Sequence, residues 1–184
     1  MILNNTKNYI FTSERLGFRN WISEDVEQMA QVNSNPNVME FFPSIPTLEQ
    51  TKAFVERMQK QFSDKKYCYF AVDALQNGTF IGFIGLSDKD FESDFTPSVD
   101  IGWRLSEEHW YKGYATEGAK ACLKYGFEKL NLEKIIATTP KINLKSEEVM
   151  KKIGMVKVKN FDHPLLLQDN RLKDCLLYEI TNPG

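Results

Sequence analysis

The chain has 184 residues, of which 42% are hydrophobic and 26% are charged, and its formal net charge is −2. This length and composition are typical of one soluble globular domain that buries a core without disulfides or a metal. The near-neutral charge removes the usual electrostatic basis of non-specific nucleic-acid binding, so we expect no nucleic-acid partner.

The cysteines and the hydrophobic pattern indicate a reduced protein outside membranes. Cys68, Cys122 and Cys175 are widely separated, show no metal-ligand spacing and are odd in number, which argues against a disulfide framework. The sequence has no uninterrupted apolar run long enough for a signal peptide or a membrane span. We therefore expect a cytoplasmic protein with no metal and no membrane partner.

Periodicity in the first half of the chain predicts strands and two helices. Ser23 can cap the first helix, and Thr47 with Gln50 forms a capping-box pattern before the second. Asn77-Gly78 between two runs of aromatic and β-branched residues is a strong hairpin signal. The expected elements are a strand over 13–19, a helix after Ser23, a helix over 48–63, and hairpin strands over 67–72 and 79–86.

The segment 33–46 lies between the two predicted helices. It contains three prolines together with several large apolar residues, so it cannot form one regular helix. We expect a packed loop, and loops of this kind often border substrate sites.

The second half of the chain alternates strands with helices. An acidic loop over 88–97 precedes a strand over 98–105, which alternates between two faces. The core face is expected to carry Val99, Ile101, Trp103 and Leu105. The other face carries Ser98, Asp100, Gly102 and Arg104. The later elements are a helix over 115–130, a strand over 134–139, a short helix from near Lys145 to Gly154, and strands over 155–161 and 173–181.

This order of elements predicts a mixed α+β fold in a single domain over 1–184. The strands 98–105 and 134–139 are joined through a helix of suitable length, so this pair requires a parallel crossover. The sequence shows no linker, internal repeat or low-complexity segment.

The stretch W-Y-K-G-Y-A-T-E, residues 110–117, joins the predicted strand 98–105 to the helix that follows. The first N–H groups of a helix lack intrahelical partners, and the helix dipole adds partial positive charge, so such a turn can hold a phosphate. Gly113 and Ala115 would let a ligand approach the backbone closely. The alternative is a plain turn with a glycine before a helix.

Three segments together resemble the GNAT acetyltransferases, in particular the RimJ/RimL-like branch of protein N-terminal acetyltransferases. They are V-D-I-G-W-R-L at 99–105, W-Y-K-G-Y-A-T-E at 110–117, and N-L-K-S-E-E-V-M-K-K-I-G-M at 143–155. The resemblance extends over nearly the whole chain, from 14 to 180. Many GNAT proteins have Gln or Arg where this chain has Trp110, whereas the RimJ/RimL-like branch commonly has Trp.

The resemblance implies a GNAT-like fold, with a sheet of about seven strands, mostly antiparallel, one splayed parallel pair and about four helices. It also implies acetyl-coenzyme A as the co-substrate. The pantetheine arm would pair with the backbone of 101–105 as a pseudo-strand, and the amides of 111–116 would hold the pyrophosphate. The implied cofactor-binding residues are Ile101, Gly102, Trp103, Arg104, Leu105, Tyr111, Lys112, Gly113, Tyr114, Ala115, Thr116 and Asn143.

Ser146 and Asp100 are the catalytic candidates that the resemblance implies. Asn143 and Ser146 match the N-x-x-S pattern of the branch, in which the Ser is a proposed acid for the departing thiolate. Either side chain can instead cap the short helix that follows. Asp100 stands where many relatives carry Glu, and a carboxylate there can take a proton from the incoming ammonium, directly or through water. A solvated strand carboxylate is the alternative.

These residues lead to the hypothesis of acetyl transfer from acetyl-coenzyme A to a primary amine by direct attack within a ternary complex. Backbone N–H groups near Trp103 would stabilise the tetrahedral oxyanion. A protein or peptide N-terminus, a polyamine and an aminoglycoside stay open as acceptors, and a non-catalytic coenzyme A-binding module is the alternative from another class. The chain is expected to be a monomer or a homodimer.

Overall fold

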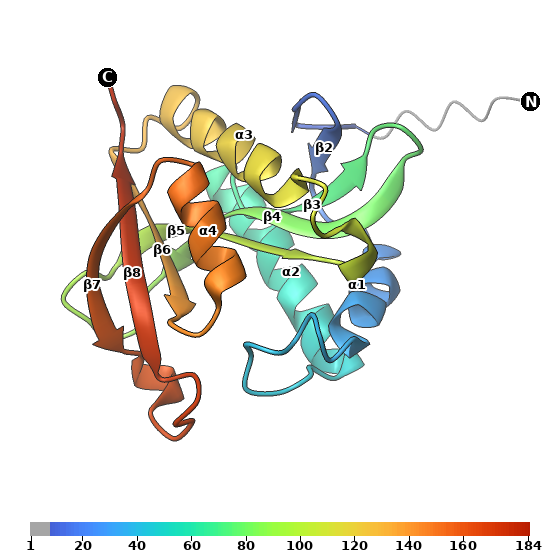
Figure 1. The fold of residues 1–184 in the computed structure, drawn as a ribbon. Coiled ribbons are helices and arrows are strands. Elements are labelled where there is room, and N and C mark those ends of the chain that lie inside the picture. Colours follow the sequence, from blue (N-terminus) through green and yellow to red (C-terminus); the bar gives the residue numbers. More distant parts are fainter. Residues whose placement is uncertain (1–7) are drawn as a thin grey trace, which may run out of the picture.

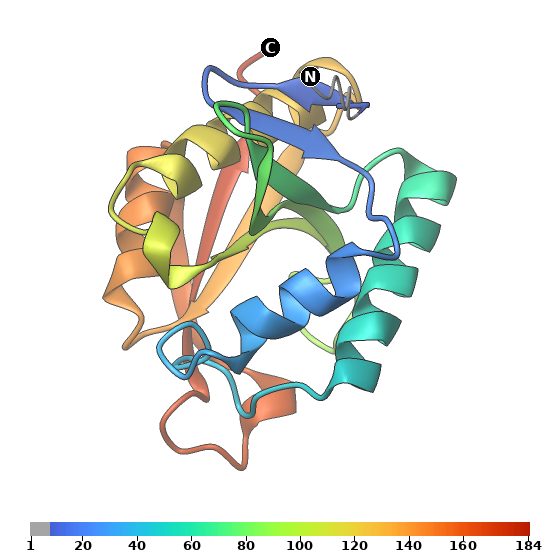
Figure 2. The ribbon, with the colours of Figure 1, turned by 90° about the vertical axis from the view of Figure 1, so that its right-hand side faces the viewer.

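The computed structural model describes residues 8–184 as one mixed sheet of eight strands covered by helices on both faces (Figures 1 and 2). The strands are β1 (Phe11–Thr12), β2 (Leu16–Arg19), β3 (Tyr69–Ala74), β4 (Thr79–Lys89), β5 (Ser98–Leu105), β6 (Lys134–Pro140), β7 (Val156–Asp162) and β8 (Asp174–Thr181). The α-helices are α1 (Asp25–Ser34), α2 (Leu48–Lys65), α3 (Tyr114–Glu128) and α4 (Leu144–Lys152), and two short 3₁₀ helices are η1 (Glu107–His109) and η2 (Pro164–Leu166).

The strand order is β1-β2-β3-β4-β5-β6-β8-β7. Neighbouring strands are antiparallel except β5 and β6, which are parallel and are joined through α3. The predicted mixed sheet with one parallel pair is therefore confirmed. The strand that the sequence did not predict is β1, because two residues are too short to show any periodicity; Phe11 pairs with Phe18 across a tight turn.

Two local predictions at the start of α2 and in the β3–β4 hairpin are confirmed. The Thr47 side chain accepts a hydrogen bond from the Gln50 N–H at 3.2 Å, and the Gln50 side chain accepts from the Thr47 N–H at 2.8 Å, which completes the capping box. The turn with Asn77-Gly78 joins the antiparallel strands β3 and β4.

The prediction that Ser23 caps the first helix is wrong. The residue before α1 is Glu24, and the Ser23 hydroxyl donates to the Glu24 carboxylate at 2.9 Å instead of accepting from a helix N–H. The carboxylate of Asp25 accepts from the Ile22 N–H at 2.9 Å. The chain therefore enters α1 through a turn that Asp25 closes, and Ser23 is left at the surface.

Asp25 also belongs to a buried ion cluster that joins β2, α1 and β3. The Arg19 guanidinium donates to the Asp25 carboxylate at 2.6 and 2.8 Å and to the Asp73 carboxylate at 2.7 and 3.1 Å. All three residues are at most 4% exposed. Since buried charges are tolerated when they are paired and hydrogen-bonded, this cluster fixes how α1 lies against the sheet.

The two faces of the sheet carry different helix pairs. Figures 1 and 2 show α1 and α2 on one face and α3 and α4 on the other. Because both faces are covered, Asp100 on the polar face of β5 is buried, while Ser98, Gly102 and Arg104 on that face are partly exposed. Asp100 is only 4% exposed, so the alternative of a solvated strand carboxylate is wrong.

Candidate active site

The parallel strands β5 and β6 separate near their carboxyl ends. They are paired only at Asp100 and Ile136, whereas β4 and β5 stay paired from Ser98 to Leu105. Figure 1 shows the two strands diverging beyond that point. Within residues 8–184, the edge of β5 over 101–105 that faces β6 has no strand partner, and ligands bind outside the carboxyl ends of parallel strands at such a point.

The turn 111–116 follows this open edge and begins α3. Among the described residues, no backbone N–H of 111–116 has an acceptor, and the first paired amide is that of Glu117, which donates to Gly113 O at 3.0 Å. Tyr111 and Gly113 have φ angles of +58° and +79°. This left-handed geometry directs unpaired N–H groups outward at the positive end of a helix dipole, which is the arrangement that binds phosphate.

Side chains hold this turn in place from two sides. The Trp110 indole donates to Leu105 O at 2.9 Å and so ties the turn to the end of β5. On the outer side, Arg15 donates to Lys112 O at 3.0 Å and to the Glu117 carboxylate at 2.6 Å. These side-chain hydrogen bonds therefore fix the shape of the turn, and its backbone N–H groups are not used in doing so.

Asn143 and Ser146 lie at the start of α4. Asn143 is the N-cap, and its side-chain oxygen accepts from the Ser146 N–H at 3.2 Å. Its amide nitrogen donates to the Ser146 hydroxyl oxygen, also at 3.2 Å. Asn143 therefore caps α4, and Ser146 is a residue of the helix. The Ser146 hydroxyl oxygen accepts from Asn143, and its hydrogen remains available to donate to another group.

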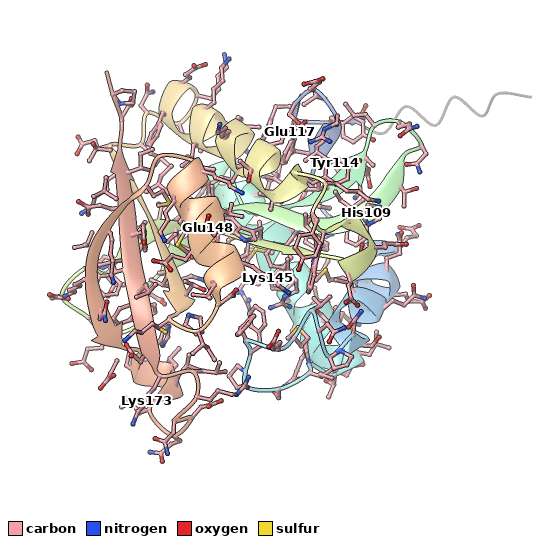
Figure 3. The ribbon with its side chains drawn as sticks, viewed as in Figure 1. His109, Tyr114, Glu117, Lys145, Glu148 and Lys173 are labelled. Atoms are coloured by element: carbon pink, nitrogen blue, oxygen red, sulfur yellow. The ribbon has the colours of Figure 1, made fainter. Side chains whose placement is uncertain are left out.

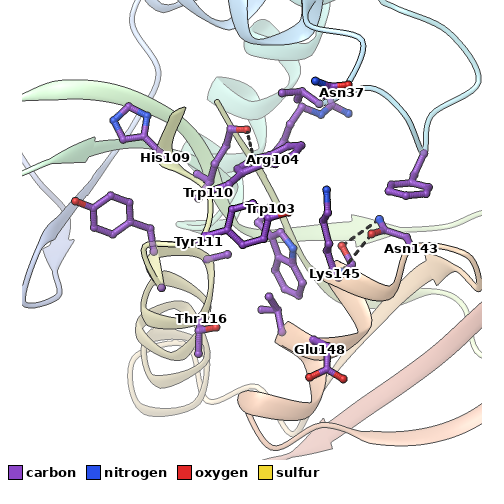
Figure 4. Close-up of a pocket in the computed structure, with 18 of the residues that line it drawn as sticks. Asn37, Trp103, Arg104, His109, Trp110, Tyr111, Thr116, Asn143, Lys145 and Glu148 are labelled. Atoms are coloured by element: carbon purple, nitrogen blue, oxygen red, sulfur yellow. Dashed lines mark hydrogen bonds between the residues drawn. The ribbon is translucent and has the colours of Figure 1, made fainter. Parts of the chain in front are cut away.

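These elements surround one cavity of about 570 Å³, a size in the range of small-molecule sites (Figure 4). The predicted site residues that line it are Trp103, Arg104, Leu105, Tyr111, Gly113, Tyr114, Ala115, Thr116, Asn143 and Ser146. The predicted residues that do not line it are Asp100, Ile101, Gly102 and Lys112. The structure thus brings together the end of β5, the turn before α3 and the start of α4.

Asp100 lies beneath this surface in a hydrogen-bonded cluster. The Tyr69 hydroxyl donates to its carboxylate at 2.6 Å, and the Lys89 ammonium lies 3.7 Å from the same oxygen. Burial raises the pKa of Asp100, and the Lys89 charge and the Tyr69 hydrogen bond offset part of that rise. Tyr69, which the sequence did not single out, therefore holds the Asp100 carboxylate, and neither residue lines the cavity.

Part of the cavity wall that α4 contributes was not predicted from the sequence. Lys145, Glu148, Val149 and Lys152 line the cavity along one side of this helix, and Figure 3 shows Lys145 and Glu148 on α4. Their spacing of three and four residues is the signal that could have identified this face. The Lys145 ammonium lies 4.5 Å from the centre of the Trp110 ring, a distance at which cation–π attraction operates.

The opposite wall comes from the loop between α1 and α2, which was expected to border a substrate site. Asn37, Val38, Phe41 and Phe42 line the cavity there. The Glu107 carboxylate accepts from Asn35 at 2.7 Å and from Asn37 at 2.8 Å, which anchors this loop to η1.

The two histidines have different surroundings. His109 lines the cavity, its Nδ1 lies 2.6 Å from the Ser106 hydroxyl, and burial lowers its pKa. His163 accepts from the Leu165 N–H at 3.2 Å and packs on Phe91, outside the cavity. Neither contact resembles the Ser–His–Asp arrangement of a nucleophilic triad.

Residues 8–184 also show whether the protein has a metal-binding cluster or a membrane-spanning helix. Within this range, no group of three or more His, Cys, Asp or Glu side chains is placed to hold a metal ion. The helices described in the same range are all too short or too polar to cross a membrane.

Solved structures with the same fold include coenzyme A complexes. A spermidine N-acetyltransferase from Vibrio cholerae, solved with coenzyme A and spermine, is 22% identical with a TM-score of 0.72, over 91% of this chain and 96% of that one. RimL, a ribosomal protein α-N-acetyltransferase solved with coenzyme A, is 14% identical with a TM-score of 0.76, over 95% and 98%. At these identities the likeness shows the fold alone, and the two proteins differ in acceptor.

Closer relatives settle the family. An acetyltransferase of the GNAT family from Bacillus anthracis is 30% identical with a TM-score of 0.78, over 94% of this chain and 98% of that one. The uncharacterised N-acetyltransferase YnaD of Bacillus subtilis is 36% identical over 145 residues, 78% of this chain and 81% of the relative. The acetyltransferase (GNAT) domain pattern matches residues 15–156. The chain therefore belongs to the GNAT family of N-acetyltransferases.

Proposed function

We propose that this protein transfers the acetyl group of acetyl-coenzyme A, its co-substrate, to a primary amine. The proposal rests on backbone groups that lack hydrogen-bond partners. They lie along the open edge of β5 and in the turn 111–116, and both segments border one cavity. The pantetheine arm would pair with 101–105 and the pyrophosphate would accept from the amides of 111–116, with Asn143 beside the arm. Ile101, Gly102 and Lys112 fit this role through their main chain, although their side chains do not line the cavity.

The reaction needs no metal and no covalent enzyme intermediate. The neutral amine attacks the thioester carbon, a C–N bond forms and the C–S bond breaks. The nitrogen then loses one proton and the thiolate accepts one. A backbone N–H near Trp103 that donates to the carbonyl oxygen would stabilise the tetrahedral oxyanion, and one such donor is worth about 2.7–4 kcal/mol in comparable sites.

Two side chains are proposed to move protons. Ser146 lines the cavity with a hydroxyl that is free to donate, which suits protonation of the departing thiolate. Asp100 would take the proton that the ammonium loses, and because it is buried under Tyr69 the path runs through the Tyr69 hydroxyl or a water. A raised carboxyl pKa makes Asp100 a stronger base than an exposed aspartate.

We favour a protein or peptide N-terminus as the acceptor. Trp110 and the N-x-x-S pattern at 143–146 match the RimJ/RimL-like branch, and RimL shares the fold. A polyamine is the second candidate, because the Vibrio cholerae spermidine enzyme has the same fold. In either case, we propose that the whole chain acts as one catalytic domain, as a monomer or a homodimer.

Calorimetric titration with acetyl-coenzyme A and a thiol-release assay over a panel of amines test this proposal. We expect saturable binding at one site per chain and thiol release only when an amine is present. A protein that binds no acetyl-coenzyme A would refute the proposal at its base. Binding without turnover on any amine would instead favour a coenzyme A-binding module.

A further inference from the structure

Arg104 lies in the cavity wall without a carboxylate partner. Its Nη1 donates to the Asn33 side-chain oxygen at 2.7 Å, and its Cζ lies 4.1 Å from the centre of the Phe42 ring and 5.4 Å from that of Phe83. Its Nε is buried, and in the part of the chain that the structure describes it has no acceptor. The guanidinium is thus held between two aromatic rings, with several N–H groups left to donate.

Two acidic side chains close to Arg104 in the sequence are used by other groups. The Glu107 carboxylate accepts from Asn35 and Asn37, and the Asp100 carboxylate accepts from Tyr69. No ion pair within residues 8–184 includes Arg104. A cation withdrawn from water without a counter-charge is costly, and two ring contacts offset only part of that cost. Its surroundings therefore favour an anion supplied from the cavity.

Arg104 is also separated from the proposed phosphate site. Its side chain contacts Asn33 of α1 and Phe42 of the loop after α1. Figure 4 places it beside Asn37, away from Thr116 and Glu148. The free amides of 111–116 and the lysines of α4 lie at the other wall, so the phosphates of the co-substrate leave Arg104 unused.

The charges around the cavity disfavour a cationic group at the Arg104 end. Arg104, Lys145 and Lys152 are the arginine and lysine residues of the described lining, which also includes His109, and its one acidic residue, Glu148, is on α4. A polyamine needs carboxylates to bind its second ammonium group, and the Arg104 end offers a positive charge instead.

We propose that Arg104 binds a carboxylate of the acceptor, so that the acceptor is an amine that also carries a carboxylate. This inference rests on the proposed acetyl transfer. Because Arg104 directly follows Trp103 in β5, the carboxylate and the reacting amine lie close together in one molecule. The α-carboxylate of a free amino acid and the side-chain carboxylate of an N-terminal Asp or Glu both supply this chemistry, and a guanidinium can bind either through two parallel hydrogen bonds.

Matched acceptor pairs that differ only in charge test the inference. One arm compares free amino acids with their amides, and a second compares peptide amides that begin with Glu or Asp with those that begin with Gln or Asn. Spermidine completes the panel. The value of kcat/KM from thiol release should favour the acid member of at least one pair by on the order of tenfold or more, the size of a hydrogen-bonded charge contact.

Arg104→Gln should reduce this ratio to about one and leave the affinity for acetyl-coenzyme A unchanged, while Arg104→Lys should keep part of the preference. Lys152→Gln is the matched control, because it removes a positive charge from the opposite wall of the same cavity and should leave the ratio unchanged. Circular dichroism establishes that each variant is folded.

A second measurement does not depend on turnover. N-acetylated amino acids and their amides are titrated into the coenzyme A complex, and the acid form should bind more tightly in wild type and lose that advantage in Arg104→Gln. Equal kcat/KM for acids and amides, a preference for spermidine, or a ratio that survives Arg104→Gln would overturn the inference and leave acetyl transfer intact. Selective binding of the acids without any turnover would support the role of Arg104 and refute the proposed function.

Discussion

Replacing Gly113 with valine tests the phosphate turn directly. Gly113 has a φ of +79°, and a Cβ built there would meet only the Arg15 guanidinium, at 3.4 Å. Space is therefore available, and the cost comes from the left-handed backbone, about 1–2 kcal/mol for a residue with a side chain. If the backbone relaxes to relieve this strain, the free amides of 111–116 turn away from their common target.

Gly154 provides a matched control at the end of α4. Its φ is +88°, and a Cβ there would lie 3.8 Å from the nearest side-chain atom, that of Ile180. Gly154→Val therefore imposes the same kind of backbone strain at a position that does not line the cavity. We expect both variants to lose a similar amount of stability, measured as the free energy of unfolding in denaturant.

The affinity for acetyl-coenzyme A should separate the two variants. A hydrogen bond to a charged group is worth about 1.5–3 kcal/mol, so the loss of one phosphate contact raises the Kd by roughly 10- to 150-fold. Calorimetry should show this weakening for Gly113→Val and an unchanged Kd for Gly154→Val. An unchanged Kd in folded Gly113→Val, or an equal loss in both variants, would refute the assignment of the turn to phosphate binding.

Four further substitutions address catalysis and stability. Ser146→Ala should lower kcat with little change in acetyl-coenzyme A affinity in steady-state and calorimetric assays, and an equal loss in both would point to a structural role. In wild type, kcat/KM should rise with pH through the pKa of Asp100, which lies above the ordinary carboxyl range because burial raises it. Asp100→Asn should remove this acidic limb of the pH profile. A variant that retains the limb would exclude Asp100 as the base. Arg19→Met removes the cation that two buried aspartates share and should lower the free energy of unfolding in denaturant by about 3–5 kcal/mol. Arg104→Met should lower it far less, because the Arg104 guanidinium meets no carboxylate in residues 8–184. Equal losses of stability would contradict this difference in pairing.

The parts of the site that the sequence predicted are those with a local signal. The turn 111–116 follows from a glycine between a strand and a helix, and the cap at the start of α4 follows from Asn143 and Ser146 at a spacing of three. Both depend on backbone geometry within one turn of helix. Short-range patterns of this kind specify such geometry well.

The parts that the sequence did not predict depend on contacts between distant segments. The polar face of β5 alternates like a solvent-exposed face, yet Tyr69 contacts Asp100 and Phe42 contacts Arg104 on that face, and Asp100 is buried with a raised pKa. Its partner Tyr69 comes from β3, and the partners of Arg104 come from α1 and the loop after it. Periodicity reports which residues share a face and says nothing of what packs on that face.

The polar face of β5 explains how one strand can hold a base and an anion-binding group without pairing them. Asp100 and Arg104 stand four residues apart, about 13 Å along an extended strand. The position between them is Gly102, and a Cβ there would lie 3.0–3.1 Å from the Tyr69 ring, so the absence of a side chain lets Tyr69 lie over the strand. The Tyr69 hydroxyl donates to Asp100, and its ring stacks at 5.0 Å on Phe83, which in turn contacts Arg104. The aromatic pair thus lies between the carboxylate and the guanidinium, as the proposed roles of Asp100 as a base and of Arg104 as a carboxylate-binding group require.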